Sequence, residues 1–108
     1  MRILIVDDNV MSLDILAASL EGSGHDVERA TDGHEGLSRI LDGDIRLVIS
    51  DWEMPGMTGE ELCQAIRSAG LPAYVYFILL TSHADSEHIV RGLAAGADDF
   101  VSKPFNPD

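Results

Sequence analysis

Short, uninterrupted apolar runs alternate along this chain with stretches in which apolar residues recur at helical spacing. Apolar runs of roughly four to eight residues are typical of strands buried on both faces of a parallel sheet, and helical stretches suit the crossovers between such strands. The alternation therefore predicts an α/β fold with the element order β-α-β-α-β-α-β-α-β. The predicted strands are 2–6, 26–30, 46–50, 73–80 and 99–102, and the predicted helices are 10 to Gly22 or Gly24, 33–41, 58–69 and 86–95.

The predicted helices carry apolar stripes, which we expect to face the sheet. Thr58 and Glu61 have the spacing of a capping box, which supports a helix start at that point. The second strand is more polar than the others and suits an edge of the sheet. The expected stripes are Val10, Leu13, Ile15, Leu16, Ala17 and Leu20 in the first helix, Leu62, Cys63, Ala65 and Ile66 in the third, and Ile89, Val90, Leu93 and Ala94 in the fourth.

Composition indicates one small acidic domain over residues 1–108. A chain of 108 residues with 45% hydrophobic content has room for one core. The formal net charge of −12, with only seven Lys and Arg residues, argues against direct binding to nucleic acid or to an acidic membrane. Cys63 is the only cysteine, so no intramolecular disulfide is expected, and the first apolar run is too short for a signal sequence. We therefore expect a cytoplasmic protein.

Polar residues stand where four of the predicted strands end. Asp7 and Asp8 follow the first strand, Asp51 the third and Thr81 the fourth, and the only lysine, Lys103, follows the fifth. The carboxyl ends of parallel strands share one edge of the sheet, which is where ligands bind in open α/β folds. If the first and third strands are neighbours, the three aspartates converge at that edge.

Three converging carboxylates favour a bound divalent cation, because they repel one another without it. Mg²⁺ suits them best, since it takes oxygen ligands and keeps waters that a phosphoryl oxygen can replace. A carboxylate beside such a cation can attack a phosphoryl group, giving an acyl phosphate at Asp51 whose charge is shared by Mg²⁺ and Lys103. The Thr81 hydroxyl could donate a hydrogen bond to a phosphoryl oxygen. Phosphoryl transfer is therefore the leading chemistry.

These motifs resemble the receiver domain of two-component response regulators over the whole chain. Five separated positions agree with that family in residue type, order and spacing, whereas any one of them alone would be a weak signal. The residues that carry the resemblance are Asp7-Asp8, the segment 51–59, Thr81-Ser82 and Lys103-Pro104-Phe105.

The resemblance implies a role for each matching residue. Asp51 matches the phosphoacceptor; Asp8, Asp51 and the backbone carbonyl of Glu53 match the Mg²⁺ ligands; and Asp7 matches the acid that holds a water of the metal. Thr81 matches the hydroxyl that moves toward the phosphoryl group, and Lys103 matches the cationic partner of that group. Phe100 matches the aromatic residue that changes rotamer after the hydroxyl moves. The Lys103-Pro104 bond matches a position that is cis in the family.

The resemblance also implies a fold and partners. The fold would be flavodoxin-like, a doubly wound five-stranded parallel sheet in the order 2-1-3-4-5. Phosphoryl groups would come from a histidine kinase or phosphotransfer protein, and the domain would act as a switch that catalyses only its own phosphotransfer and autodephosphorylation. Asn106-Pro107 is a helix-start signal. We therefore expect the last helix to be missing here and to lie beyond Asp108, with an output domain there or a separate effector protein.

Other interpretations of these residues remain open at this point. The chain could be a phosphorylation-independent interaction module, which would form no acyl phosphate, or a metal-dependent phosphatase, which would turn over a free phosphomonoester. A lone aspartate after a strand is usually a cap or turn residue. Trp52 is expected to be a partly exposed loop residue, and His25, His34, His83 and His88 are expected to be surface histidines, the first two of them in loops.

Overall fold

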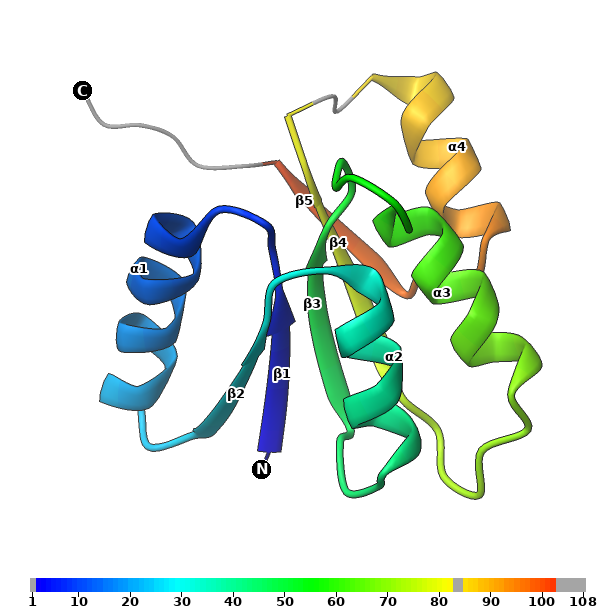
Figure 1. The fold of residues 1–108 in the computed structure, drawn as a ribbon. Coiled ribbons are helices and arrows are strands. Elements are labelled where there is room, and N and C mark those ends of the chain that lie inside the picture. The colour runs from blue at the N-terminus through cyan, green and yellow to red at the C-terminus, as the bar shows by residue number, and fades with distance from the viewer. Residues whose placement is uncertain (1, 83–84, 103–108) are drawn as a thin grey trace.

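The computed structural model describes residues 2–82 and 85–102, which form a five-stranded parallel sheet flanked by helices (Figure 1). The strand order is β2-β1-β3-β4-β5. This confirms the predicted α/β class and the flavodoxin-like order. The elements are β1 (Arg2–Val6), α1 (Val10–Gly22), β2 (Asp26–Ala30), α2 (Gly33–Leu41), β3 (Leu47–Asp51), α3 (Gly59–Ser68), β4 (Tyr76–Thr81), α4 (Ser86–Ala94) and β5 (Asp99–Ser102).

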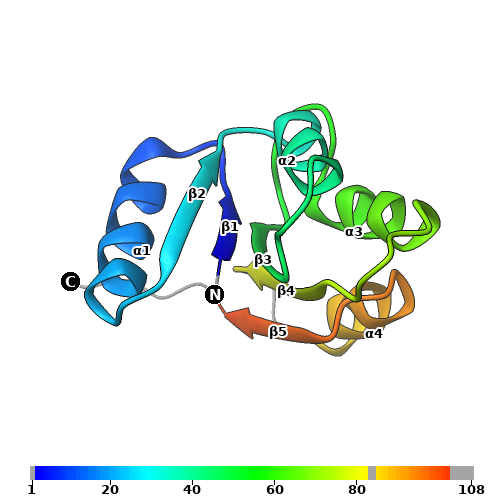
Figure 2. The ribbon, with the colours of Figure 1, turned by 90° about the horizontal axis from the view of Figure 1, so that it is seen from below.

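The helices lie on both faces of the sheet, with α1 on one side and α2, α3 and α4 on the other (Figure 2). Strand β1 contributes to both sides because successive side chains of a strand point to opposite faces. Leu4 and Val6 belong to the larger core cluster under α2 and α3. Ile3 and Ile5 belong to a smaller cluster with α1. All four side chains are almost completely buried, so β1 is a central strand, and the polar β2 is an edge strand as predicted.

Each helix begins at a side chain that caps it. Asn9, Asp32, Thr58 and Asp85 precede α1, α2, α3 and α4, and each accepts a hydrogen bond from the backbone N–H three residues later. The capping box predicted for α3 is present, since the Glu61 carboxylate also accepts from the Thr58 backbone N–H at 2.9 Å. These caps place every helix start at the carboxyl edge of the sheet, where each helix follows a strand.

Two predicted strand boundaries were wrong. Strand β3 is one residue later than predicted and includes Asp51. Strand β4 is Tyr76–Thr81, not 73–80. The apolar run does begin at residue 73, but pairing with β3 begins only where the Tyr76 N–H donates to the Arg46 carbonyl at 2.9 Å. Apolar character alone therefore overestimated the strand at its start and missed Thr81 at its end.

Parts of the predicted apolar stripes face solvent. Val10 and Ile15 of α1 are exposed, and only Leu13 and Ala17 of that helix are fully buried. In α4, Val90 and Leu93 are 65% and 50% exposed, and Ala94 is exposed as well. The buried residue of α4 is Gly92, because the helix packs closely at its glycine. None of the described helices has the length and apolar content needed to cross a membrane.

Candidate functional site

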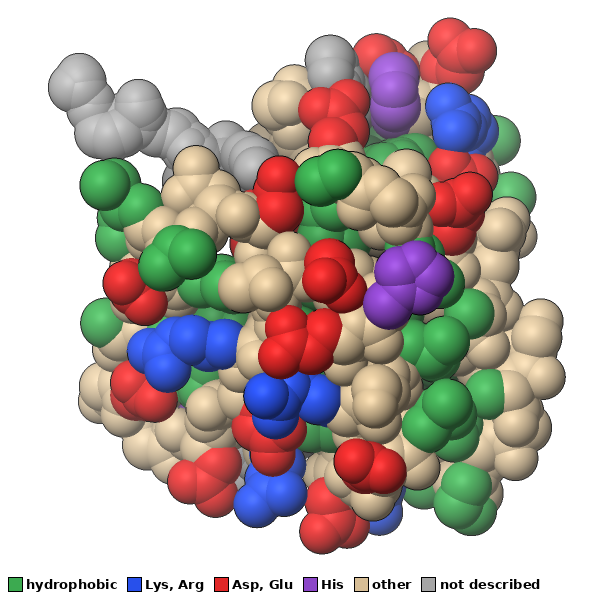
Figure 3. Space-filling view, viewed as in Figure 1, with side chains coloured by type: hydrophobic (Ala, Val, Ile, Leu, Met, Phe, Trp, Pro, Cys, Tyr) green, Lys and Arg blue, Asp and Glu red, His purple; other side chains and the backbone are tan. Residues whose placement is uncertain are grey.

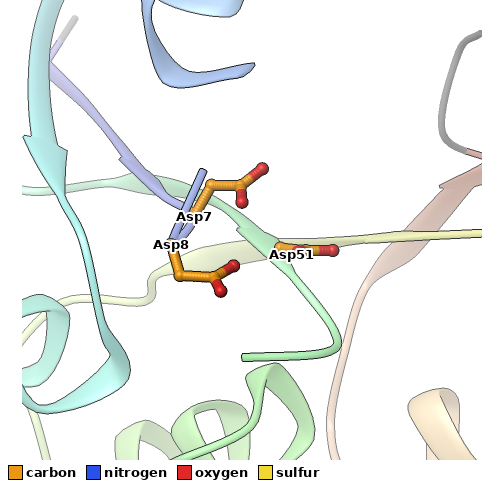
Figure 4. Close-up of side chains that lie close together, drawn as sticks. All are labelled: Asp7, Asp8 and Asp51. Atoms are coloured by element: carbon orange, nitrogen blue, oxygen red, sulfur yellow. The ribbon is translucent and has the colours of Figure 1, made fainter. Parts of the chain in front are cut away.

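Three carboxylates meet at the carboxyl edge of the sheet, as the strand ends predicted. One oxygen from each of Asp7, Asp8 and Asp51 lies within 4.8 Å of the other two. The side chains extend toward the same side from the ends of β1 and β3 (Figure 4). Asp7 and Asp51 are each 5% exposed, whereas Asp8 is exposed. The cluster is therefore a concentration of acidic groups with one carboxylate open to solvent.

The turn after β1 holds Asp7 and Asp8 in place through the start of α1. The Asp7 backbone N–H donates to the Ala30 carbonyl of β2 at 3.1 Å. The Asp7 carboxylate accepts from the Asn9 N–H at 3.0 Å, and the Asn9 side chain in turn caps α1 by accepting from the Ser12 N–H. Because the backbone is fixed on both sides of Asp8, this exposed carboxylate is directed to the cluster by the turn.

Asp51 is the last residue of β3, a strand paired on both sides. Its carbonyl accepts from the Ser50 hydroxyl at 2.9 Å. Helix α3 begins directly against it: a Cβ added to Gly59 would lie 2.3 Å from the Asp51 carbonyl oxygen. Only glycine permits this close approach. Between them, the segment that carries the exposed Glu53 loops over the strand end.

Thr81 and Phe100 lie on the two strands beyond Asp51. Thr81 ends β4 and is 2% exposed, one residue past Leu80, the register partner of Asp51. Phe100 of β5 is half-buried and packs against the larger core cluster. Ser102 pairs with Thr81, so the fifth strand reaches the same edge. Lys103 and its bond to Pro104 lie outside the described residues, as does His83.

The donor set suits a hard divalent cation. Carboxylate oxygens are ligands that Mg²⁺ and Ca²⁺ prefer, and three of them in one place lower the electrostatic free energy of a cation bound among them. Among the residues that the structure describes, the cluster offers carboxylate oxygens, which suit a hard cation better than zinc or copper. The Asp51 carboxylate thus belongs to a cluster that a hard cation fits.

Trp52 lies in a loop as expected, between β3 and α3, but the expectation that it is partly exposed was wrong. Trp52 follows Asp51, but its side chain is only 5% exposed and belongs to the larger core cluster. It meets His88 of α4 edge-on, at 5.3 Å between ring centroids, so His88 is also less of a surface residue than expected. His34 lies in α2 and not in a loop. The sequence did contain one signal for this burial. Gly92 lies within the predicted fourth helix, and a glycine at such a position leaves room for a large ring to pack against the helix.

The family model for the response regulator receiver domain matches residues 3–108 of this chain. The chain is 36% identical to the DNA-binding response regulator MtrA of Mycobacterium tuberculosis over 107 residues, which are 98% of this chain and 45% of that protein. It is 33% identical to the phosphate regulon transcriptional regulatory protein PhoB of Pseudomonas aeruginosa over 105 residues, 97% of this chain and 46% of that protein. The chain thus spans about half the length of these curated relatives.

Solved structures agree with the sequence comparison. The chemotaxis response regulator CheY4 of Vibrio cholerae has a TM-score of 0.90 at 34% identity, over 98% of this chain and 88% of that one. The response regulator TrrA of Thermotoga maritima, in complex with Mg²⁺ and BeF, has a TM-score of 0.84 at 35% identity, over 97% of this chain and 88% of that one. From its fold, its acidic cluster and these matches, the chain belongs to the family of response regulator receiver domains.

Proposed function

We propose that Asp51 accepts a phosphoryl group in a reaction that requires Mg²⁺. The observation that carries this proposal is the convergence of Asp7, Asp8 and Asp51 within 4.8 Å at the carboxyl edge of the sheet. The Thermotoga relative, whose structure is described as a complex with Mg²⁺ and BeF, supports it by similarity. Receiver domains are signalling switches and not general enzymes, so the reaction serves to change the state of the domain.

The chemistry assigns each residue a task. A carboxylate oxygen of Asp51 attacks the phosphorus of a phosphohistidine, the phosphorus–nitrogen bond breaks, and the donor histidine leaves with the electron pair. Asp8, Asp51 and the Glu53 carbonyl would hold Mg²⁺, with Asp7 holding one of its waters. When bound, Mg²⁺ supplies charge that offsets the phosphoryl oxygens. Hydrolysis by water later returns phosphate and the unphosphorylated Asp51 carboxylate, which is the autodephosphorylation that completes the cycle.

Thr81, Lys103 and Phe100 form the proposed response to phosphorylation. Phosphorylation adds about −1.5 to −2 charge, which a hydroxyl and an ammonium group can stabilise. Thr81 ends β4, the strand paired with that of Asp51, which supports the proposal that its hydroxyl donates a hydrogen bond to the new phosphoryl group. Phe100 lies further along the sheet on β5 and would repack after Thr81 moves. The phosphorylation-independent interaction module is the alternative, and it needs none of these steps.

The partners follow from the same proposal. A histidine kinase or phosphotransfer protein would supply the phosphoryl group in the cytoplasm. Because the curated relatives are about twice as long as this chain, we propose that the domain 1–108 controls an output domain beyond Asp108 or a separate effector. On the face shown in Figure 3, basic side chains are interleaved with acidic ones. Arg39, for example, pairs with Glu28 and Glu35. This arrangement supports the expectation that the domain itself contacts neither nucleic acid nor membrane.

Acetyl phosphate with Mg²⁺, followed by intact mass measurement, tests this proposal. The wild type should gain the mass of one phosphoryl group, and Asp51→Asn should gain none. Asp8→Asn should gain much less phosphoryl mass at the same Mg²⁺ concentration, because it removes a proposed Mg²⁺ ligand but keeps the nucleophile. Thr81→Ala should still be phosphorylated. A wild type that binds Mg²⁺ without gaining mass would contradict the proposal and favour the interaction module.

A further inference from the structure

The ring of Trp52 fills the space between the phosphoacceptor strand and α4. Its centroid lies 5.3 Å from that of His88 on α4 and 6.5 Å from that of Phe100 on β5, and both contacts are edge-on. The guanidinium carbon of Arg91, also on α4, lies 5.7 Å from the Trp52 ring centroid. Edge-on aromatic pairs and cation–π contacts are both attractive at these distances. Two residues of α4 therefore hold this one ring.

Helix α4 rests on the sheet where it meets this ring. A Cβ added to Gly92 would lie 3.0 Å from a methyl carbon of Leu79 and 3.4 Å from the Trp52 ring. The apolar residues Val90 and Leu93 face solvent and contribute little to its attachment. Because close-packed groups cannot pass through one another, a displacement of the Trp52 ring toward α4 must displace that helix as well.

The α4 side chains at the ring are held by partners of their own. His88 Nδ1 lies 2.9 Å and 3.1 Å from the two carboxylate oxygens of Asp85, the residue that caps α4. Arg91 donates to Glu60 of α3 at 2.6 Å. These bonds fix the His88 ring and the Arg91 guanidinium relative to the helices. A movement of the Trp52 ring against these two side chains therefore moves α4, because the side chains cannot simply turn aside.

The backbone of Trp52 connects the ring to both parts of the phosphoacceptor site. Trp52 is covalently joined to Asp51, and its N–H donates to the Leu80 carbonyl at 2.9 Å. Leu80 is joined in turn to Thr81. A movement of the backbone at Asp51 therefore reaches Trp52 through one peptide bond. A movement at Thr81 reaches it through the Leu80 carbonyl and the hydrogen bond that this carbonyl accepts.

We propose that Trp52 is a positioning residue that couples the state of Asp51 to the position of α4, with His88, Arg91 and Gly92 as its contacts on that helix. The proposal rests on the proposed phosphorylation of Asp51. It adds a second route beside the one from Thr81 to Phe100: the signal passes from the strand end directly to α4 through one ring.

Hydrogen exchange of α4 with and without Mg²⁺ and beryllium fluoride tests the coupling. Fluorine NMR of the same samples reports whether the phosphoryl mimic is bound. In the wild type we expect bound fluoride and a change of about fivefold or more in the exchange rates of α4 amides, the size of an ordinary allosteric coupling. Trp52→Val should keep the bound fluoride and lose most of the exchange response. Trp52→Phe, which keeps an aromatic ring, should restore part of it.

Variants on the α4 side guard against a Trp52 variant that fails to fold. His88→Ala removes one contact of the ring and should weaken the response, whereas Val90→Ala, an exposed change on the same helix, should leave it intact. A full response in folded Trp52→Val or His88→Ala, with fluoride bound, would overturn the coupling and leave the proposed function standing. Absence of bound fluoride in the wild type would instead overturn the proposed function, and the coupling with it.

Discussion

The two edges of the sheet arrange charge in opposite ways. At the carboxyl edge, three groups of the same sign, Asp7, Asp8 and Asp51, are brought within 4.8 Å of one another. At the amino edge, Arg67 of α3 meets Asp98, the residue before β5, at 2.8 Å. Like charges held together raise the free energy of the folded state, whereas a partly buried pair of opposite charges lowers it when its hydrogen bonds are complete.

The pair at the amino edge has extensive hydrogen bonding. Arg67 also donates to the Gly96 carbonyl at 2.9 Å and to the Val75 carbonyl at 2.7 Å. Asp98 accepts from the Phe77 N–H at 2.9 Å. The pair thus joins α3 to the segments that lead into β4 and β5, which are far apart in the sequence.

The Tyr74 side chain completes the amino edge. Its ring lies 4.6 Å from the guanidinium carbon of Arg67, and its hydroxyl donates to the Asp98 carboxylate. That hydrogen bond raises the pKa of Tyr74, because the neutral phenol donates and the phenolate cannot. The difference between the two edges indicates that the carboxyl edge is the functional one. At the amino edge, paired opposite charges stabilise the fold, whereas at the carboxyl edge like charges lie together in an arrangement that a bound cation would stabilise.

The largest expected effect on the stability of the fold comes from Arg67→Ala. The substitution removes three hydrogen bonds and leaves Asp98 partly buried without its arginine, which should lower the free energy of unfolding by about 3 kcal/mol. Urea unfolding followed by Trp52 fluorescence measures it. Arg46→Ala, at an exposed arginine just before β3, is the matched control and should change stability little. Equal losses in the two variants would contradict a structural role for the amino edge.

A smaller effect of opposite sign is expected for Asp8→Asn. Removing one of three like charges should raise the free energy of unfolding by about 1 kcal/mol without Mg²⁺, because Asp8 is exposed and its repulsion is screened. Adding Mg²⁺ should reverse the order, since a ligand at ten times its Kd stabilises the wild type by about 1.4 kcal/mol. Urea unfolding with and without Mg²⁺ measures both.

Asp26→Asn provides the control for that experiment. Asp26 is exposed and begins β2, at the amino edge and away from the three carboxylates. Its substitution should leave the Mg²⁺ dependence of stability unchanged. A wild type that gains no stability from Mg²⁺, or an Asp26→Asn variant that loses the gain, would show that the acidic cluster is not the metal site.

Alkaline pH should weaken the core next to the amino edge through Cys63. Burial raises the pKa of this thiol from 9.0 to about 11, so the unfolded chain ionises first as pH rises. Its contribution to stability is therefore complete below pH 9.0 and is lost as pH rises toward about 11. Unfolding free energies measured across that range should fall more steeply for the wild type than for Cys63→Ala. Equal pH dependence of the unfolding free energy in the two proteins would contradict a contribution from the Cys63 thiol.

The smallest effect concerns Glu35, an acid near the carboxyl edge whose role is structural. Its carboxylate accepts from the Thr31 N–H at 2.9 Å, which, with help from Arg39, holds the pKa of Glu35 below its usual 4.5. This contribution is present above pH 4.5 and is lost as pH falls through the lowered pKa. Glu35→Gln should therefore make acid unfolding slightly less steep, and should not alter Mg²⁺ binding.

The sequence was sufficient to predict the sheet and the convergence of the aspartates. Apolar runs marked the strands because buried parallel strands need them, and residues after parallel strands must share an edge. The sequence alone therefore predicted that Asp7 and Asp51 lie close together, although it gives no information about individual contacts. The roles of Thr81, Glu53, Phe100 and Lys103 remain predictions, and Lys103 lies outside the described residues.

Contacts between distant segments could not be predicted in this way. The Arg67–Asp98 pair joins residues 31 apart, and nothing in local spacing distinguishes Arg67 from a solvent-exposed arginine at a helix end. The expected burial of Val90 and Leu93 failed for a related reason. Periodicity identified an apolar face of α4, but the position of the helix is set by the closest approach, which is at Gly92.

Paramagnetic broadening by Mn²⁺ tests most directly the claim that the carboxyl edge is the metal-dependent site. Mn²⁺ binds the same hard oxygen ligands as Mg²⁺ and broadens nearby NMR signals. At substoichiometric Mn²⁺, we expect the backbone amide signals of Asp7, Asp8 and Asp51 to disappear first, those of Arg67 and Asp98 to persist, and excess Mg²⁺ to restore the lost signals. Broadening spread evenly over the acidic surface, or centred on another group of carboxylates, would contradict the account.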